Sequence, residues 1–380
     1  MSISRRRFAQ LLGAGAAAAV VRPALSFAEA ATGAFPPATA ASEMVRLSAN
    51  ENPYGPSPKA LRAMSAAYDR ACRYPDESAD ALAGSLARLH GVGREQILLG
   101  DGSSEILKLC ADEFSGPLPK EKGKTAGGRL VLADPTFEAI LYHATMNHAA
   151  IEKVPLTASY GHDLPKMMAA AEKGLIYVCN PNNPTASTTP KKELRDFIEH
   201  APNDSIILVD EAYYHYADSP DYESVIPLVK DHVNLIVTRT FSKIYGMAGL
   251  RCGYAVAQGN TIERLRERQS WDSSNVMALV AAAASLEDPE QVAKNRRLNN
   301  ETRAFTTNQL AKIGYPSIAS QANFIMFDAK RPVVPLIASL KQKKVQVGRL
   351  FRALPNHLRL TIGTRAEMET FLKAFQEVIG

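Results

Sequence analysis

Residues 238–253 read TRTFSKIYGMAGLRCG and place one lysine, Lys243, between a strand and a glycine-rich turn. The apolar run 234–237 predicts a buried strand, so Lys243 follows the carboxyl end of a strand, where ligands collect in α/β sheets. A lysine amine in a partly dry site loses its proton easily and can form an imine with a carbonyl. Arg251 could hold an anion. The pair Ser242-Lys243 on its own fits an ordinary surface lysine better than a functional one.

Two further polar side chains follow predicted strands. Asp210 comes directly after the apolar strand 205–209, where a carboxylate is costly to bury unless it meets a cation or a donor. Asn183 lies in a polar loop after the strand 175–179. Asn183, Asp210 and Lys243 are 27 and 33 residues apart, one strand–helix–strand unit each time. We therefore expect the three at one edge of one sheet, with an acidic helix cap as the alternative for Asp210.

Composition indicates a globular protein without a polyanion partner. The chain has 380 residues, of which 46% are hydrophobic and 22% charged. The net charge of +5 is concentrated at the amino end, where four arginines precede the first acidic residue, Glu29. The remainder has 40 basic against 39 acidic residues. Its charge therefore gives no reason to expect binding to nucleic acid.

Residues 1–28 have the three parts of an export signal. A basic start precedes the apolar run 11–21, and residues 26–28 form a small-x-small cleavage site. The apolar run is too short to span a bilayer. Residues 4–8 resemble a twin-arginine (Tat) signal, which exports proteins already folded. We expect the Tat machinery as a partner and a periplasmic or secreted location.

The cysteines and histidines predict no metal site. Cys72, Cys110, Cys179 and Cys252 have no paired close spacing, and the eight histidines show no HExxH pattern. Cys110, Cys179 and Cys252 lie in apolar runs. We expect these three to be buried free thiols.

Ser242-Lys243 followed by AGLRCG at 248–253 resembles the pyridoxal-phosphate lysine segment of class I/II aminotransferases, with histidinol-phosphate aminotransferases as the nearest branch. The resemblance implies a fold-type-I enzyme and a homodimer. Its large domain, 58–285, would hold a mostly parallel seven-stranded sheet flanked by helices. A small α+β domain would span 286–380, and an amino-terminal arm, 29–57, would pack with that domain.

The resemblance also implies residue roles. Lys243 would hold pyridoxal 5'-phosphate as an imine and carry the proton between the substrate and the cofactor. Asp210 would keep the ring nitrogen protonated, while Asn183 and Tyr213 would bond the phenolate oxygen. Phe137, where many relatives have tyrosine, would stack on the ring. The cofactor phosphate would meet Gly102, Ser103, Ser104, Ser242, Arg251 and, across the dimer, Tyr74.

Substrate contacts are implied by the same resemblance. Asn52 and Tyr54 belong to an NENPYG segment similar to the family's substrate lid, and Arg359 matches its anion-binding arginine. One departure is Ala186, where the family usually has glycine, and we expect a changed backbone angle there. The expected donor is an amino acid or an amino-alcohol phosphate, histidinol-phosphate-like or aromatic, and the acceptor a 2-oxo acid such as 2-oxoglutarate. A decarboxylase or lyase on this fold, and a non-catalytic periplasmic binding protein, are the alternatives.

Overall fold

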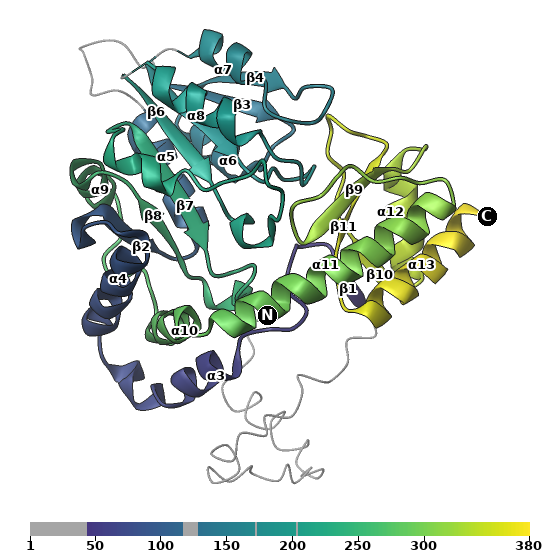
Figure 1. The fold of residues 1–380 in the computed structure, drawn as a ribbon, viewed down its shortest axis with the longest axis horizontal. Coiled ribbons are helices and arrows are strands. Elements are labelled where there is room, and N and C mark those ends of the chain that lie inside the picture. Colours follow the sequence, from purple (N-terminus) through teal and green to yellow (C-terminus); the bar gives the residue numbers. More distant parts are fainter. Residues whose placement is uncertain (1–43, 117–127, 172, 203) are drawn as a thin grey trace, which may run out of the picture. The chain divides into compact units, whose positions relative to one another are not determined.

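The computed structural model describes residues 44–116, 128–171, 173–202 and 204–380 (Figure 1). The predicted export signal and most of the predicted amino-terminal arm lie outside these ranges. The described part of the chain forms one compact unit. None of its helices is long and apolar enough to cross a membrane.

A seven-stranded sheet organises the larger part of the molecule, with the strand order β2-β8-β7-β6-β5-β3-β4. All neighbouring pairs from β7 to β4 are parallel, whereas β8 runs antiparallel to both of its neighbours. The predicted mostly parallel seven-stranded sheet is therefore confirmed. The strands are β2 (Ile97–Gly100), β3 (Arg129–Asp134), β4 (Ala150–Pro155), β5 (Gly174–Cys179), β6 (Ser205–Asp210), β7 (Leu235–Thr240) and β8 (Gly253–Val256).

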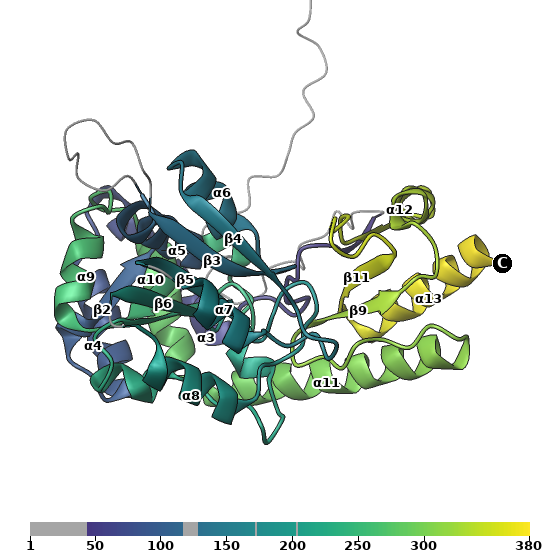
Figure 2. The ribbon, with the colours of Figure 1, turned by 90° about the horizontal axis from the view of Figure 1, so that it is seen from above.

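Helices cover both faces of this sheet (Figure 2). Successive residues of a strand point to opposite faces, so Tyr177 packs in one core cluster while Ile176 and Val178 pack in the other. Burial on both faces explains why the central strands β5 and β6 read as nearly continuous apolar runs, whereas the edge strand β4 is largely exposed. One face carries α5 (Ser103–Phe114), α6 (Ala139–Met146) and α9 (Gly259–Arg266). The other carries α3 (Pro58–Ser65), α4 (Asp76–His90), α7 (Leu164–Ala170), α8 (Lys191–His200) and α10 (Val276–Leu286).

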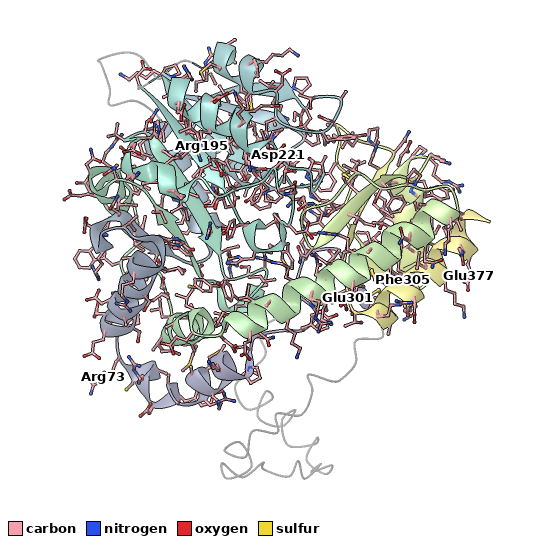
Figure 3. The ribbon with its side chains drawn as sticks, viewed as in Figure 1. Arg73, Arg195, Asp221, Glu301, Phe305 and Glu377 are labelled. Carbon is pink, nitrogen blue, oxygen red and sulfur yellow. The ribbon has the colours of Figure 1, made fainter. Side chains whose placement is uncertain are left out.

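The long helix α11 (Pro289–Lys312) leads from α10 to two small sheets (Figure 1). Phe327, Phe371 and Phe375 pack in the separate apolar core of this smaller part, whose side chains are drawn in Figure 3. In one small sheet β9 and β11 are antiparallel, and in the other β1 and β10 are parallel. The elements are β1 (Val45–Leu47), β9 (Phe324–Asp328), α12 (Val333–Gln342), β10 (Val345–Val347), β11 (His357–Thr361) and α13 (Arg365–Ile379).

Several element boundaries differ from those that the sequence predicts. The sequence pattern predicts a helix over 136–147, but the helix begins only at Ala139, and the Thr136 hydroxyl donates to Asn182 Oδ1 at 2.8 Å. The pattern also predicts one helix over 58–71, whereas the structure has an α-helix that ends at Ser65 and a 3₁₀ helix that begins at Tyr68. The 3₁₀ helices are Tyr68–Cys72, Arg94–Gln96, Tyr214–Tyr216, Ile226–Lys230 and Ala248–Leu250. The division into large and small domains at residue 285 stays a prediction.

Candidate active site

The carboxyl ends of β5, β6 and β7 lie side by side and bring the three polar residues together. In the strand register Cys179 pairs with Asp210, and Asp210 pairs with Thr238. Asn183 and Lys243 follow within a few residues of the strands that carry them. A cavity of about 310 Å³ opens at this edge. Ten of the predicted site residues line it: Ser103, Ser104, Phe137, Asn183, Asp210, Tyr213, Ser242, Lys243, Arg251 and Arg359.

The Lys243 amine is partly buried at the wall of this cavity. Its Nζ donates to the backbone oxygens of Asn50 at 3.2 Å and Ala49 at 3.4 Å. Burial, assisted by the positive charge of Arg359, lowers the pKa of Lys243 to about 8, although Asp210 acts in the opposite direction. More of the amine is therefore unprotonated near neutral pH than in a lysine exposed to water, and the unprotonated form can attack a carbonyl.

The Asp210 carboxylate is buried and held by two neutral donors. The Tyr177 hydroxyl donates to Oδ2 and the Ala212 N–H to Oδ1, each at 3.0 Å. Burial raises the pKa of Asp210 to about 6, and these two hydrogen bonds and the Lys243 charge only partly oppose the shift. A cation on the cavity side would therefore stabilise the ionised carboxylate. Sequence reasoning missed Tyr177, because a tyrosine inside an apolar strand gives no sign of its hydrogen bond.

Asn183 and Tyr213 are joined by a hydrogen bond. Asn183 Nδ2 donates to the Tyr213 oxygen at 3.2 Å, and Asn183 Oδ1 accepts from Arg359 Nη1 at 2.8 Å. The same Tyr213 oxygen accepts from Asn50 Nδ2 at 3.0 Å. The Tyr213 ring packs edge-on against Phe324, with 5.0 Å between centroids. Asn183 and Tyr213 are thus held in place by Asn50, Arg359 and Phe324 while both line the cavity.

Ser103, Ser104 and Arg251 form a cup at the amino terminus of α5. The first N–H groups of a helix lack intrahelical partners and suit an anion. Arg251 donates to Ser242 Oγ and to the Asp101 backbone oxygen, each at 3.3 Å. Gly102 caps the helix with φ of 71°, and a Cβ there would collide with the Arg251 guanidinium. Gly102 is not among the residues that line the cavity. Because it has no side chain, it leaves room for the Arg251 guanidinium.

A second arginine, Arg349, lines the cavity beside Arg359 and escaped the sequence analysis. The Arg359 guanidinium is buried, donates to the Ser48 backbone oxygen at 2.6 Å, and leaves Nε without a partner among the described residues. Phe351 lies 5.1 Å from the Arg359 guanidinium and 4.4 Å from that of Arg349. Arg349 also pairs with Glu138. In the sequence, the only sign that Arg349 lines the cavity is its position in the loop before β11.

Three predicted contacts lie away from the cavity in this single chain. Asn52 Nδ2 donates to the Ile244 backbone oxygen at 2.8 Å, and its Oδ1 accepts from the Tyr54 N–H at 3.1 Å. Asn50 lines the cavity instead of these two. Tyr74 is 80% exposed. The substrate contacts of Asn52 and Tyr54, and the phosphate contact of Tyr74 across a dimer, stay predictions.

Two further expectations can be compared with the structure. Ala186 has φ of 61°, in the left-handed region that favours glycine, so the loop keeps a glycine-type backbone where we expected a changed angle. Cys110, Cys179 and Cys252 are buried free thiols, as predicted, whereas Cys72 is exposed. Over the described residues no cluster of three or more His, Cys, Asp or Glu side chains is placed to bind a metal ion.

Comparison with known protein families gives a match over residues 42–375 to "Aminotransferase class I and II". The chain belongs to this family. This aminotransferase is 37% identical over 342 residues to a histidinol-phosphate aminotransferase of Moorella thermoacetica, covering 89% of this chain and 86% of that protein. It is 36% identical over 341 residues to one of Symbiobacterium thermophilum, covering 89% and 91%.

A solved structure gives the same result for this aminotransferase. Histidinol-phosphate aminotransferase from Sinorhizobium meliloti, in complex with pyridoxal-5'-phosphate, superposes with a TM-score of 0.80 at 25% identity, covering 88% of this chain and 90% of that chain. The predicted fold-type-I architecture, pyridoxal phosphate and aminotransferase activity are thereby confirmed. These relatives are aminotransferases and give no support to the decarboxylase or binding-protein alternatives.

The residues of this aminotransferase fit the cofactor. The cavity offers an amine with a lowered pKa at Lys243, an aromatic ring at Phe137, and a buried carboxylate at Asp210 that has no salt bridge to any residue the structure describes. The cup at the start of α5 offers hydroxyl, N–H and guanidinium donors for a phosphate. Each chemical group of pyridoxal phosphate therefore has a complementary partner in one cavity.

Proposed function

We propose that this aminotransferase takes an amino donor that carries an anionic group, histidinol-phosphate-like or an aromatic amino acid, and transfers its amino group to a 2-oxo acid such as 2-oxoglutarate. The supporting observation is the pair Arg359 and Arg349 on one wall of the cavity, with the Phe351 ring between them. A guanidinium binds carboxylate or phosphate through two parallel bonds. The unpaired Nε of Arg359 would gain an acceptor from such a group.

The roles of the side chains follow from their chemistry. Bound pyridoxal phosphate supplies an electron sink for the carbon that loses its proton. Lys243 holds the cofactor and moves the proton at the substrate carbon, because its amine titrates near the working pH. Asp210 keeps a proton on the ring nitrogen. Asn183 and Tyr213 donate to the phenolic oxygen of the cofactor, and the phosphate is held by Ser103, Ser104, Ser242 and Arg251.

Replacing Arg359 tests the donor class. Arg359→Ala should lower kcat/KM for histidinol phosphate and for aromatic amino acids by roughly 10- to 150-fold, since a hydrogen bond to a charged group contributes about 1.5–3 kcal/mol. The rate at saturating donor should fall much less. Arg352→Ala, which removes an exposed arginine from the same loop, is the matched control. Steady-state kinetics with 2-oxoglutarate as acceptor give both parameters.

The proposed donor class would be contradicted if Arg359→Ala lowered kcat/KM equally for anionic donors and for an amino donor that has no anionic group. Arg359 would then act by positioning Asn183, to which it donates, rather than by binding the anion. Comparison of histidinol phosphate with aromatic amino acids in Arg349→Ala then distinguishes the two donors. A phosphate dianion is expected to lose more than a carboxylate when one of two guanidinium groups is removed.

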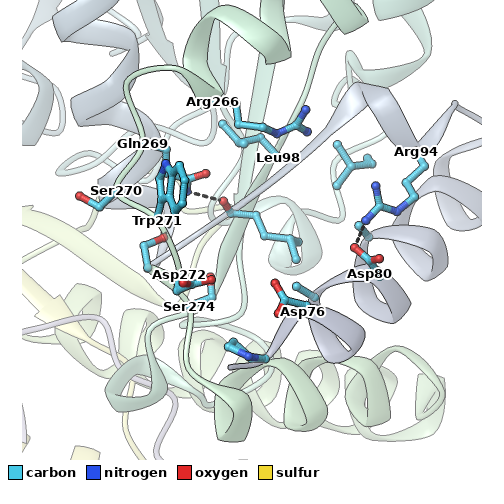
Figure 4. A pocket seen from close by; sticks show the side chains of 16 residues that line it. Asp76, Asp80, Arg94, Leu98, Arg266, Gln269, Ser270, Trp271, Asp272 and Ser274 are labelled. Carbon is cyan, nitrogen blue, oxygen red and sulfur yellow. Dashed lines mark hydrogen bonds and ion pairs between the residues drawn. The ribbon is translucent and has the colours of Figure 1, made fainter. Parts of the chain in front are cut away.

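We also propose a homodimer in which Tyr74 reaches the phosphate cup of the neighbouring subunit. Trp271, 94% exposed, borders a hollow of about 360 Å³ (Figure 4), which is also lined by Pro75, the residue after Tyr74. The loop that carries Trp271 is bonded to the first turn of α5, because Gln269 and Ser273 both donate to Glu105 Oε2. Large exposed aromatic side chains are typical of interfaces. A two-fold contact here would bring each Tyr74 towards the other cup.

Light scattering tests the dimer. Wild-type protein should have the mass of two chains, and Trp271→Ala should weaken that association. Tyr74→Phe should stay dimeric and folded but lose cofactor faster on dialysis, because one donor to the phosphate is removed. Tyr142→Phe, an exposed tyrosine on α6, is the control. A fully active monomer would rule the proposal out.

We further propose that residues 1–28 export the folded enzyme to the periplasm through the Tat machinery. The support is the pattern of residues 4–8, 11–21 and 26–28 alone, since this segment lies outside the described residues. Replacing Arg5 and Arg6 by lysine should leave the protein in the cytoplasm with its leader intact. Intact-mass analysis of the wild-type protein should give an amino terminus near Glu29. Uncleaved protein confined to the cytoplasm would refute it.

A further inference from the structure

Asn50 occupies an unusual position at the cavity wall. It is 1% exposed and has φ of 54°, a left-handed conformation that few residues other than glycine adopt. Its backbone oxygen accepts from Lys243 Nζ at 3.2 Å and from Asn323 Nδ2 at 3.0 Å. Strained backbone of this kind is kept where the surroundings require it, and it often marks a functional position.

Thr361, on β11, fixes the orientation of the Asn50 amide. The Thr361 hydroxyl oxygen accepts from the Asn50 backbone N–H at 2.9 Å, and the hydroxyl donates to Asn50 Oδ1 at 3.1 Å. A hydroxyl group has one proton and can still accept, so both contacts are satisfied together. The amide oxygen therefore faces Thr361, and the amide Nδ2 faces Tyr213.

The Tyr213 oxygen receives two amide donors. Asn50 Nδ2 donates at 3.0 Å and Asn183 Nδ2 at 3.2 Å. The Asn183 amide is fixed as well, because its Oδ1 accepts from the Arg359 guanidinium, a group that can only donate. A phenolic oxygen has one proton and two acceptor positions. With both acceptor positions taken, the proton of Tyr213 is left to point away from the two amides, towards the cavity that Tyr213 lines.

We propose that Asn50 is a positioning residue, whose amide, oriented by Thr361, directs the phenolic proton of Tyr213 towards the phenolic oxygen of the cofactor. The inference rests on the proposed role of Tyr213 at that oxygen. The contacts of Asn50 also connect the two parts of the fold, because Thr361 belongs to the small antiparallel sheet and Tyr213 follows β6 of the large sheet. Asn50 itself touches neither the substrate carbon nor its proton in this assignment.

The visible absorption of the cofactor-loaded protein, followed as a function of pH, tests the proposal without an activity assay. A donor at the phenolic oxygen stabilises negative charge there, so its loss favours the protonated chromophore and moves the spectral midpoint to higher pH. Tyr213→Phe should raise the midpoint by about 1–2 pH units, the equivalent of one hydrogen bond to a charged group. Asn50→Gly should raise it by a smaller amount, roughly half a unit to one unit.

Asn50→Gly is the informative variant because glycine accepts the left-handed backbone and keeps the backbone contacts to Lys243 and Thr361. Combined with Tyr213→Phe, it should add no further shift, since the effect runs through Tyr213. Thr361→Val, which leaves Asn50 in place, should shift the midpoint in the same direction. Asn295→Ala removes a buried amide that donates to the Ile244 backbone oxygen at 2.9 Å, and it should cause no shift.

An unchanged midpoint in Asn50→Gly would overturn the proposal. It would also be overturned if Asn50→Gly shifted the midpoint as much in the Tyr213→Phe background as in the wild type. If Asn50→Gly does not fold, Thr361→Val decides alone: a shift supports the proposal, and none overturns it. Failure of the proposed function has a different signature. In that case Tyr213→Phe itself would leave the midpoint unchanged, whatever stands at position 50.

Discussion

Lys243→Ala is expected to lower the rate at which the amino donor converts the bound cofactor by several powers of ten. General acid–base catalysis alone contributes roughly 10²- to 10⁴-fold, and covalent activation by the amine adds to it. In the described part of the chain the Lys243 amine donates to the backbone oxygens of Ala49 and Asn50, and alanine removes the amine without putting another basic group in its place. Single-turnover spectroscopy of the loaded variant measures this rate directly.

Cofactor binding should survive in the same variant, because Ser103, Ser104 and Arg251 remain to hold the phosphate. This separates a lost catalytic group from a lost fold. Lys230→Ala, at an exposed lysine, is the control and should behave as wild type. A Lys243→Ala protein that binds the cofactor and transaminates at a near wild-type rate would remove the proton-transfer role of this lysine.

Asp210→Asn is expected to lower the same rate by about 10²- to 10⁴-fold, since removing one member of a buried charge pair costs about 3–5 kcal/mol. Asparagine has nearly the same shape and can still accept from Tyr177 or the Ala212 N–H, so the loss reports the charge. Asp221→Asn, at an exposed carboxylate that Figure 3 labels, is the control. A rate within a few-fold of wild type would contradict a charged partner for the ring nitrogen.

The pH dependence of cofactor binding checks the same carboxylate. The pKa of Asp210 is raised to about 6 in the protein alone, so the carboxyl group becomes neutral as the pH falls through that value. A neutral carboxyl no longer stabilises a protonated ring nitrogen. Cofactor affinity of the wild type should therefore decrease below about pH 6. The affinity of Asp210→Asn should lack this step, and an identical profile for both proteins would contradict it.

The sequence predicts the part of the site that strand order controls. Parallel strands joined by helices place their carboxyl ends at one edge, so the spacing of Asn183, Asp210 and Lys243 was enough to bring them together. The buried strands are short apolar runs with clear ends. The glycine-rich turn before α5 likewise indicates a helix amino terminus, and Ser103 and Ser104 lie there.

Contacts between segments far apart in the sequence could not be predicted from local sequence patterns. Strand β1 has three residues with an arginine in the middle, and its parallel partner β10 lies some 300 residues away, so no local pattern indicates the pair. Asn50 follows β1 and Arg349 lies in the loop before β11, so both reach the cavity from segments far in sequence from β5, β6 and β7. Asn52 and Tyr54, four residues or fewer from Asn50, were predicted as substrate contacts from the resemblance of the NENPYG segment. Local sequence does not fix which side chains of a turning chain face a cavity.

Covalent labelling of the loaded wild-type protein tests the central claim, that Lys243 is the residue that carries pyridoxal phosphate. Borohydride reduction followed by proteolysis and mass spectrometry should give one modified peptide, the peptide that contains Lys243, with the visible band lost in parallel. Lys243→Ala treated in the same way should bind the cofactor but leave no label on the peptide chain, because without the imine borohydride reduces only the unattached aldehyde. A label on another lysine, or none in a protein that retains its activity, would contradict the account.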